Sequence, residues 1–265
     1  MSFARLQALI DAKECRVAVG LDPRPDMLRG GETLLDWGKR IIDAVADIVP
    51  AVKPQWAFYE AAGSLGIAAL SETIRCAKQR GLYVIADAKR GDIGSTADAY
   101  ADAYLGSGEL RADCVTVNPY LGSDGVKPFM YQAEASDGAL FALVKTSNPS
   151  SAELQDITTE SGELVYIRVA NMLNALDTTG DRVGFVIGAT YPEQLADLRS
   201  RFPKTFFLVP GYGAQGGTAE MVSAAFADGG SRAIVSSSRA IICAADVRIA
   251  AQKARDEINN ALGLR

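Results

Sequence analysis

The sequence of 265 residues contains no histidine. Its absence excludes the Ser-His-Asp and Cys-His nucleophile systems and removes the commonest zinc ligand. Any acid–base chemistry must therefore use Asp, Glu, Lys, Tyr or Cys. The four cysteines lie far apart and form no C-x-x-C motif. We expect free thiols in a reducing, cytoplasmic environment, with neither a zinc site nor a redox pair.

Long apolar runs and basic runs are absent as well. No stretch reaches the roughly 18 apolar residues that a membrane span needs. Residues 1–14 lack the small-residue cleavage site of a signal peptide. The formal net charge of -5 argues against nucleic acid or an anionic membrane as a partner. We therefore expect a cytoplasmic protein without a nucleic-acid or membrane partner.

Short apolar segments alternate with longer amphipathic ones along the whole chain. The apolar segments are rich in Val, Ile, Leu and Phe without clean alternation, as in parallel strands buried on both faces. Eight strands are predicted: Val17–Leu21, Pro50–Lys53, Tyr83–Asp87, Cys114–Asn118, Leu140–Lys145, Val183–Ile187, Phe206–Val209 and Ala233–Ser236. Helices are predicted near 33–48, 58–79, 94–105, 124–134, 160–176, 191–201, 217–228 and 240–261.

Eight βα units in a chain of this length predict a (β/α)8 TIM barrel, with an open doubly wound sheet as the alternative. A short helix over 3–12 precedes the first strand and is expected to cap the barrel floor. No linker or repeat divides the chain, so residues 1–265 are interpreted as a single domain.

The run IADAKRGDIGST, residues 85–96, carries an acid–base–acid series at the end of a predicted strand. Residues two apart on a strand point the same way, so Asp87 and Lys89 share one face. Asp92 follows in the loop. Because barrel active sites lie at the C-terminal ends of the strands, these charges are expected to meet Asp22 and Lys53 from strands one and two.

Such a group of charges has several interpretations. The first is a structural salt-bridge network. The second is a Mg²⁺ site built from the aspartates, and the third is a lysine that forms a Schiff base. The fourth is an array of coupled lysines and aspartates that stabilises a carbanion and then protonates it. Neighbouring aspartates oppose the lowered pKa that a Schiff-base lysine needs.

A second signal lies at the ends of strands seven and eight. The segment 210–217 is glycine-rich and precedes a helix, and Arg239 begins the next one. Loops after these two strands commonly bind phosphate in barrels of this kind. Arginine adds a bidentate donor. We therefore expect a phosphate site here, although the glycines also fit a purely structural role in tight turns.

Taken together, the motifs resemble orotidine 5′-phosphate decarboxylase in its bacterial second group. The match covers nearly the whole chain: VGLDP at 19–23, VKPQ at 52–55, DAKRGDIGST at 87–96, TVNPYLGSD at 116–124, KTSNPS at 145–150, PGYGAQGG at 210–217 and SSSRAI at 236–241. The resemblance implies conversion of orotidine 5′-monophosphate to UMP and CO2, the last step of UMP synthesis, without metal or cofactor.

The resemblance also implies roles for individual residues. Lys89 would protonate C6 of the pyrimidine and Asp87 would lie beside the departing carboxylate. Lys53 would pair with Asp87 and reach the ribose, where Asp22 also binds. A homodimer is implied, because Asp92, with Ile93 and Thr96, would enter the site of the other subunit. The remaining substrate contacts would be Ser147 at the pyrimidine edge, Gln215 between phosphate and base, Arg239 on the phosphate, and Gly217 and Ser238 nearby.

Two rivals remain. Sugar-phosphate lyases such as 3-keto-gulonate 6-phosphate decarboxylase and hexulose-phosphate synthase share D-x-K-x-x-D but use Mg²⁺; the T-S-N-P and G-A-Q-G-G segments argue against them. A catalytically silent nucleotide-binding protein is the other rival. The segment 148–165 is longer than in compact archaeal forms, and its role is not fixed by any motif.

Overall fold

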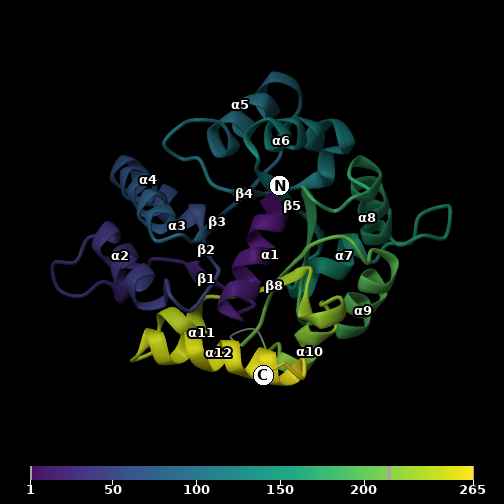
Figure 1. Ribbon diagram of the computed structural model, residues 1–265. Helices are drawn as coiled ribbons and strands as arrows, with labels where there is room; N and C mark the ends of the chain where they lie inside the picture. Colours follow the sequence, from purple (N-terminus) through teal and green to yellow (C-terminus); the bar gives the residue numbers. More distant parts are fainter. Residues whose placement is uncertain (1, 214–215, 265) are drawn as a thin grey trace.

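The computed structural model describes residues 2–213 and 216–264, and these form a closed parallel barrel (Figure 1). The strands pair in sequence order, and β8 closes against β1. Their bounds are β1 Val17–Leu21, β2 Ala51–Pro54, β3 Tyr83–Arg90, β4 Cys114–Val117, β5 Ala139–Lys145, β6 Val183–Ile187, β7 Phe207–Pro210 and β8 Ala233–Ser237. The predicted TIM barrel is confirmed, and the open doubly wound sheet is wrong.

Helices surround the barrel (Figure 1). The α-helices are α1 Ser2–Lys13, α2 Leu34–Val45, α3 Trp56–Glu60, α4 Gly63–Gln79, α5 Gly94–Leu105, α6 Ser123–Ser136, α7 Ala152–Gln155, α8 Val165–Leu176, α9 Pro192–Arg201, α10 Ala219–Ser223, α11 Arg239–Ile242 and α12 Val247–Ala261. Short 3₁₀ turns are η1 Pro25–Met27, η2 Pro119–Leu121, η3 Pro149–Ser151 and η4 Asp228–Gly230. Within these described ranges, no helix is both long and apolar enough to cross a membrane.

Three of the predicted helices differ from those observed. The helix expected over 58–79 is broken before Gly63, whose φ of +64° suits glycine and interrupts the helical path. The helix expected over 240–261 is two helices, because the Asp246 side chain accepts a hydrogen bond from the Ile249 backbone and starts α12 afresh. The helix expected over 217–228 is only the five-residue α10.

Helix α1 closes the N-terminal end of the barrel, as predicted. It runs across the barrel axis in Figure 1, and its buried side chains Phe3, Leu6 and Ile10 join the apolar cluster inside the strands. The Phe3 ring lies 4.9 Å from that of Phe141 and 5.0 Å from that of Phe206. This floor is therefore dry and close-packed, while the opposite end is left for polar groups.

We predict that Leu6→Ala lowers the free energy of unfolding by about 2–5 kcal/mol, because it leaves a cavity between α1 and the strands. Urea titration followed by circular dichroism would measure this. Ala8→Ser, at an exposed position of the same helix, is the control and should change stability by less than about 0.5 kcal/mol. Equal effects of the two substitutions would show that α1 is not a structural plug.

Candidate active site

The charged side chains of the site continue the inward-facing rows of the strands. On β2 the inward row runs from Ala51 to Lys53, and on β3 it runs from Tyr83 through Ile85 to Asp87. The lower members of these rows belong to the apolar cluster at the floor, and successive inward positions are two residues apart. Each row therefore begins with apolar side chains at the floor and ends with a charged side chain, Lys53 on β2 and Asp87 on β3.

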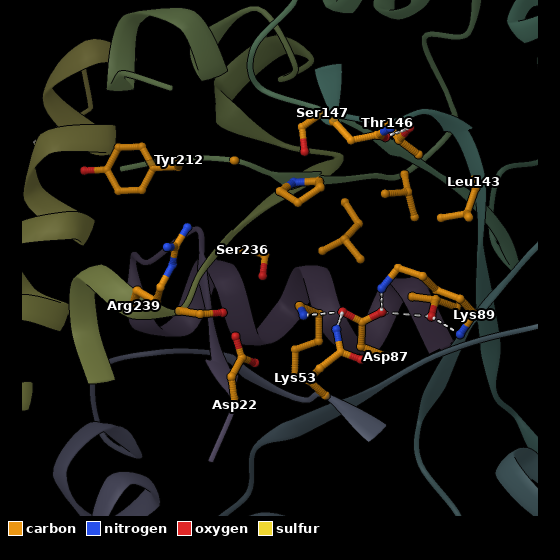
Figure 2. A pocket seen from close by; sticks show the side chains of 18 of the residues that line it. Asp22, Lys53, Asp87, Lys89, Leu143, Thr146, Ser147, Tyr212, Ser236 and Arg239 are labelled. Atoms are coloured by element: carbon orange, nitrogen blue, oxygen red, sulfur yellow. Dashed lines mark hydrogen bonds and ion pairs between the residues drawn. The ribbon is translucent and has the colours of Figure 1, made fainter. Parts of the chain in front are cut away.

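Asp87 is the centre of the charged group (Figure 2). Its Oδ2 accepts from Lys53 Nζ at 2.5 Å and from Gln55 Nε2 at 3.0 Å. Its Oδ1 accepts from Lys89 Nζ and from Thr116 Oγ1, the latter at 3.2 Å. Both carboxylate oxygens are thus engaged, and the lysines are held on opposite sides of one anion.

Burial and charge oppose each other in this group. Burial alone would raise the pKa of Asp87, but the Lys53 and Lys89 ammonium groups outweigh it and hold the pKa well below its usual range. Burial alone would lower the pKa of Lys53, but the carboxylates of Asp87 and Asp22 outweigh it and raise the pKa. Asp87 and Lys53 are therefore both ionised at neutral pH.

Lys89 adopts an uncommon backbone conformation, with φ of +48°. For a residue with a side chain, this region carries strain. The Lys89 backbone N–H donates to Thr116 Oγ1 at 2.9 Å, and the register between β3 and β4 shifts between Ala86 and Arg90. The Lys89 side chain, 46% exposed, faces the cavity while Asp87 is buried. Lys89 is thus the ammonium that a ligand meets.

Asp22 lies beside the charged group and points into the same cavity (Figure 2). Its Oδ1 is buried and, among the described residues, has no hydrogen-bond partner. Such an acceptor is costly unless a ligand satisfies it. Gly20 leaves room for the Ser238 and Asp22 side chains, because a Cβ on Gly20 would lie 1.8 Å from Ser238 Oγ and 3.1 Å from Asp22 Oδ1.

A cavity of about 530 Å³ joins the charged group to Arg239, a volume suited to a small molecule. Figure 2 shows Arg239 and Tyr212 across the cavity from Lys89, with Ser147 and Thr146 along another edge. The lining includes Asp22, Lys53, Asp87, Lys89, Ser147, Ser238 and Arg239 together with the apolar Leu143, Val186, Leu208 and Pro210. The cavity therefore has a basic end, an apolar middle and an acid–base end.

The structure describes only one of the two residues in the glycine-rich loop that were predicted to bind substrate. Gly217 does not line this cavity; a Cβ there would lie 2.7 Å from the Gly211 carbonyl oxygen, so it shapes the loop by close approach. Gln215 lies outside the described residues. Tyr212 turns its hydroxyl away from the cavity and donates to Glu257 on α12 (Figure 2).

Asp92, Ile93 and Thr96 also lie outside the cavity of their own chain. They follow β3 at the start of α5, where Ile93 is 55% exposed and Thr96 is exposed. The Asp92 Oδ1 accepts only the neighbouring Ile93 backbone N–H, at 2.8 Å, among the contacts of the described chain.

The sequence reasoning missed several residues of the site. Gln55 and Thr116 both contact Asp87, and both lie on inward rows, so strand alternation carried a signal for them. No comparable signal existed for Gln155, which comes from the segment 148–165 and lines the cavity beside Thr146.

The family model for "Orotidine 5'-phosphate decarboxylase / HUMPS family" matches residues 16–254. An orotidine 5′-phosphate decarboxylase of Rhodopirellula baltica is 46% identical over 92% of this chain and 89% of that protein. One from Roseiflexus castenholzii is 42% identical over 98% of both chains.

A solved structure supports the same family. The structure of Leishmania donovani OMP decarboxylase superposes with a TM-score of 0.87 and 38% identity, covering 100% of this chain and 99% of that one. With the extended family match and these full-length identities, the chain belongs to the orotidine 5′-phosphate decarboxylase / HUMPS family.

Proposed function

We propose that this chain is an orotidine 5′-monophosphate decarboxylase (EC 4.1.1.23), which releases CO2 from its substrate to form UMP in pyrimidine synthesis. The observation that carries the proposal is the Lys53–Asp87–Lys89 group at one end of a cavity whose other end holds Arg239. The relatives from Rhodopirellula baltica and Roseiflexus castenholzii, matched over 89% and 98% of their own length, support the same activity.

The proposed reaction uses the position of Lys89 next to Asp87. The bond between C6 and its carboxylate breaks, CO2 leaves, and the electron pair remains on C6. The Lys89 ammonium stabilises this charge and donates its proton to C6, then regains a proton from solvent. Asp87, which accepts a hydrogen bond from Lys89, would lie beside the substrate carboxylate, and the repulsion between them would be relieved as CO2 departs.

The remaining contacts serve to hold the nucleotide. Lys53 and the unpartnered Oδ1 of Asp22 suit the ribose hydroxyl groups. Ser147 suits the pyrimidine edge. The phosphate would bind at the basic end of the cavity, where the proposed contacts are Arg239, Ser238, Gln215 and the loop shaped by Gly217. Binding energy from the distant phosphate would help to position the base for reaction.

We infer that the working unit is a homodimer in which Asp92, Ile93 and Thr96 complete the partner's site. The support is exposed apolar surface: Ile93, Tyr120 and Leu121 are 55%, 75% and 46% exposed. Leu121 lies close to Asp92, since a Cβ on Gly125 would lie 3.2 Å from Leu121 Cβ and 3.1 Å from the Asp92 carbonyl oxygen. Exposed apolar side chains gathered in one region favour contact with another protein surface. Two-fold symmetry would give each subunit's cavity the Asp92 of the other.

We predict that Lys89→Ala lowers kcat by at least about 10⁴-fold, because it removes both the cation near C6 and the proton donor. Turnover is followed by the loss of orotidine 5′-monophosphate absorbance, and UMP binding by calorimetry should survive. Lys39→Ala, at an exposed position of α2, is the matched control. Near-normal turnover by Lys89→Ala would refute the proton-donor assignment.

Addition of EDTA should leave turnover unchanged, because the proposed chemistry relies on lysine cations. Both oxygens of Asp87 already accept hydrogen bonds from lysines, which leaves the carboxylate poorly disposed toward a divalent cation. The same absorbance assay, with and without chelator, measures this. Turnover abolished by EDTA would overturn the metal-independent chemistry. Absence of turnover would point to a metal-dependent sugar-phosphate lyase, or, if UMP still binds, to a silent binder.

Mixing two inactive variants tests the shared site. Lys89→Ala and Asp92→Ala disable different components, so a hybrid dimer has one site carrying both changes and one intact site. Random re-association should restore about a quarter of wild-type activity. No recovery after subunit exchange, verified by mass spectrometry of the intact dimers, would show that Asp92 acts within its own subunit.

A further inference from the structure

The loop 146–155, which follows β5, is closed at its base by two adjacent side-chain pairs. Lys145 Nζ donates to Asp156 Oδ1 at 2.7 Å. The Thr146 backbone N–H donates to Gln155 Oε1 at 2.9 Å, and Gln155 Nε2 donates to Thr146 Oγ1 at 2.8 Å. Because the paired residues are neighbours in sequence on both sides, the two pairs together form a clamp across the loop ends.

The outer pair of this clamp, Lys145 and Asp156, is anchored in the protein interior. The Lys145 side chain is 0% exposed, and its Nζ lies 3.2 Å from Ser151 Oγ and 4.7 Å from the centre of the Tyr191 ring. A buried ammonium group is strongly unfavourable without a partner. Asp156, whose side chain is 30% exposed, is therefore held in place by Lys145, and Gln155 is held with it.

The inner pair, Thr146 and Gln155, faces the cavity. Gln155 and Thr146 both line it, together with Ser147 and Asn148 from the same loop. The Thr146 hydroxyl donates to Asn148 Oδ1 at 2.6 Å while accepting from Gln155. The Gln155 amide thus orders the Thr146 backbone, which precedes Ser147. Through the Thr146 hydroxyl it also orders the Asn148 side chain, which follows Ser147.

We propose that Gln155 is a positioning residue for recognition of the pyrimidine base, with the Lys145–Asp156 pair holding it in place. The inference rests on the proposed function, since it assigns the loop's Ser147 to the base. Gln155 acts by fixing the Thr146–Ser147 backbone, so that Ser147 meets the base without an ordering cost at binding. Arg239 lies at the other end of the cavity and is not one of the four clamp residues.

The test compares a ligand that has a base with one that lacks it. Gln155→Met keeps the side-chain volume, removes both hydrogen bonds to Thr146 and leaves the buried Lys145–Asp156 pair intact. Calorimetry should show UMP binding weakened about tenfold, as for the loss of ordered hydrogen bonds, with ribose 5-phosphate binding unchanged. The KM for orotidine 5′-monophosphate should rise by a similar factor while kcat changes by less than about threefold.

Glu153→Ala, at an exposed position of the same helix α7, is the control and should match the wild type for both ligands. Lys145→Met, where it folds, should reproduce the pattern of Gln155→Met, because it releases Asp156. Equal weakening of both ligands, or no weakening of either, would overturn the proposal. If the wild-type chain neither binds UMP nor consumes orotidine 5′-monophosphate, the proposed function fails and this inference with it.

Discussion

The site is organised around one carboxylate shared by two ammonium groups. Asp87 is buried, and its two oxygens accept from Lys53 and Lys89. The carboxylate holds the group together, because removal of Asp87 would leave the buried Lys53 ammonium without its ion-pair partner and close to a second ammonium. Its geometry in turn depends on β2, β3 and β4, because Lys53, Asp87 and Thr116 each occupy an inward strand position.

The two ends of the barrel have different roles: the floor contributes packing that stabilises the fold, and the mouth carries the charged groups of the site. At the floor, α1 packs Phe3, Leu6 and Ile10 against the apolar inward residues of the strands. At the mouth, the same inward rows carry charges whose desolvation is unfavourable, and Lys89 holds a strained backbone. A well-packed floor therefore offsets a mouth that is arranged for binding and proton transfer rather than for stability.

Loops control how this mouth meets a nucleotide. Arg239 and residues 210–212 line the cavity across from Lys89, so a ligand that reaches both sides is fixed along its length. The loop after β5 lies along another edge and is tied to the barrel by Lys145 and Gln155. Orientation thus comes from several separate strand ends, which is the general advantage of a barrel mouth as a site.

The sequence by itself determined the eight strands, the capping helix and four of the charges at the cavity; a fifth, Asp92, was expected to join them but lies outside the cavity of its own chain. These follow from local patterns: the composition of the strands, the two-residue alternation of side chains along a strand, and a motif at the end of a strand. Only the tertiary structure decided that Thr116 and Gln55 complete the Asp87 contacts, that Gly217 lies outside the cavity lining while the Tyr212 hydroxyl donates to Glu257, and that Gln155 closes on Thr146. Those contacts join separate strands and loops, and barrel closure and register set their distances, which no local pattern encodes.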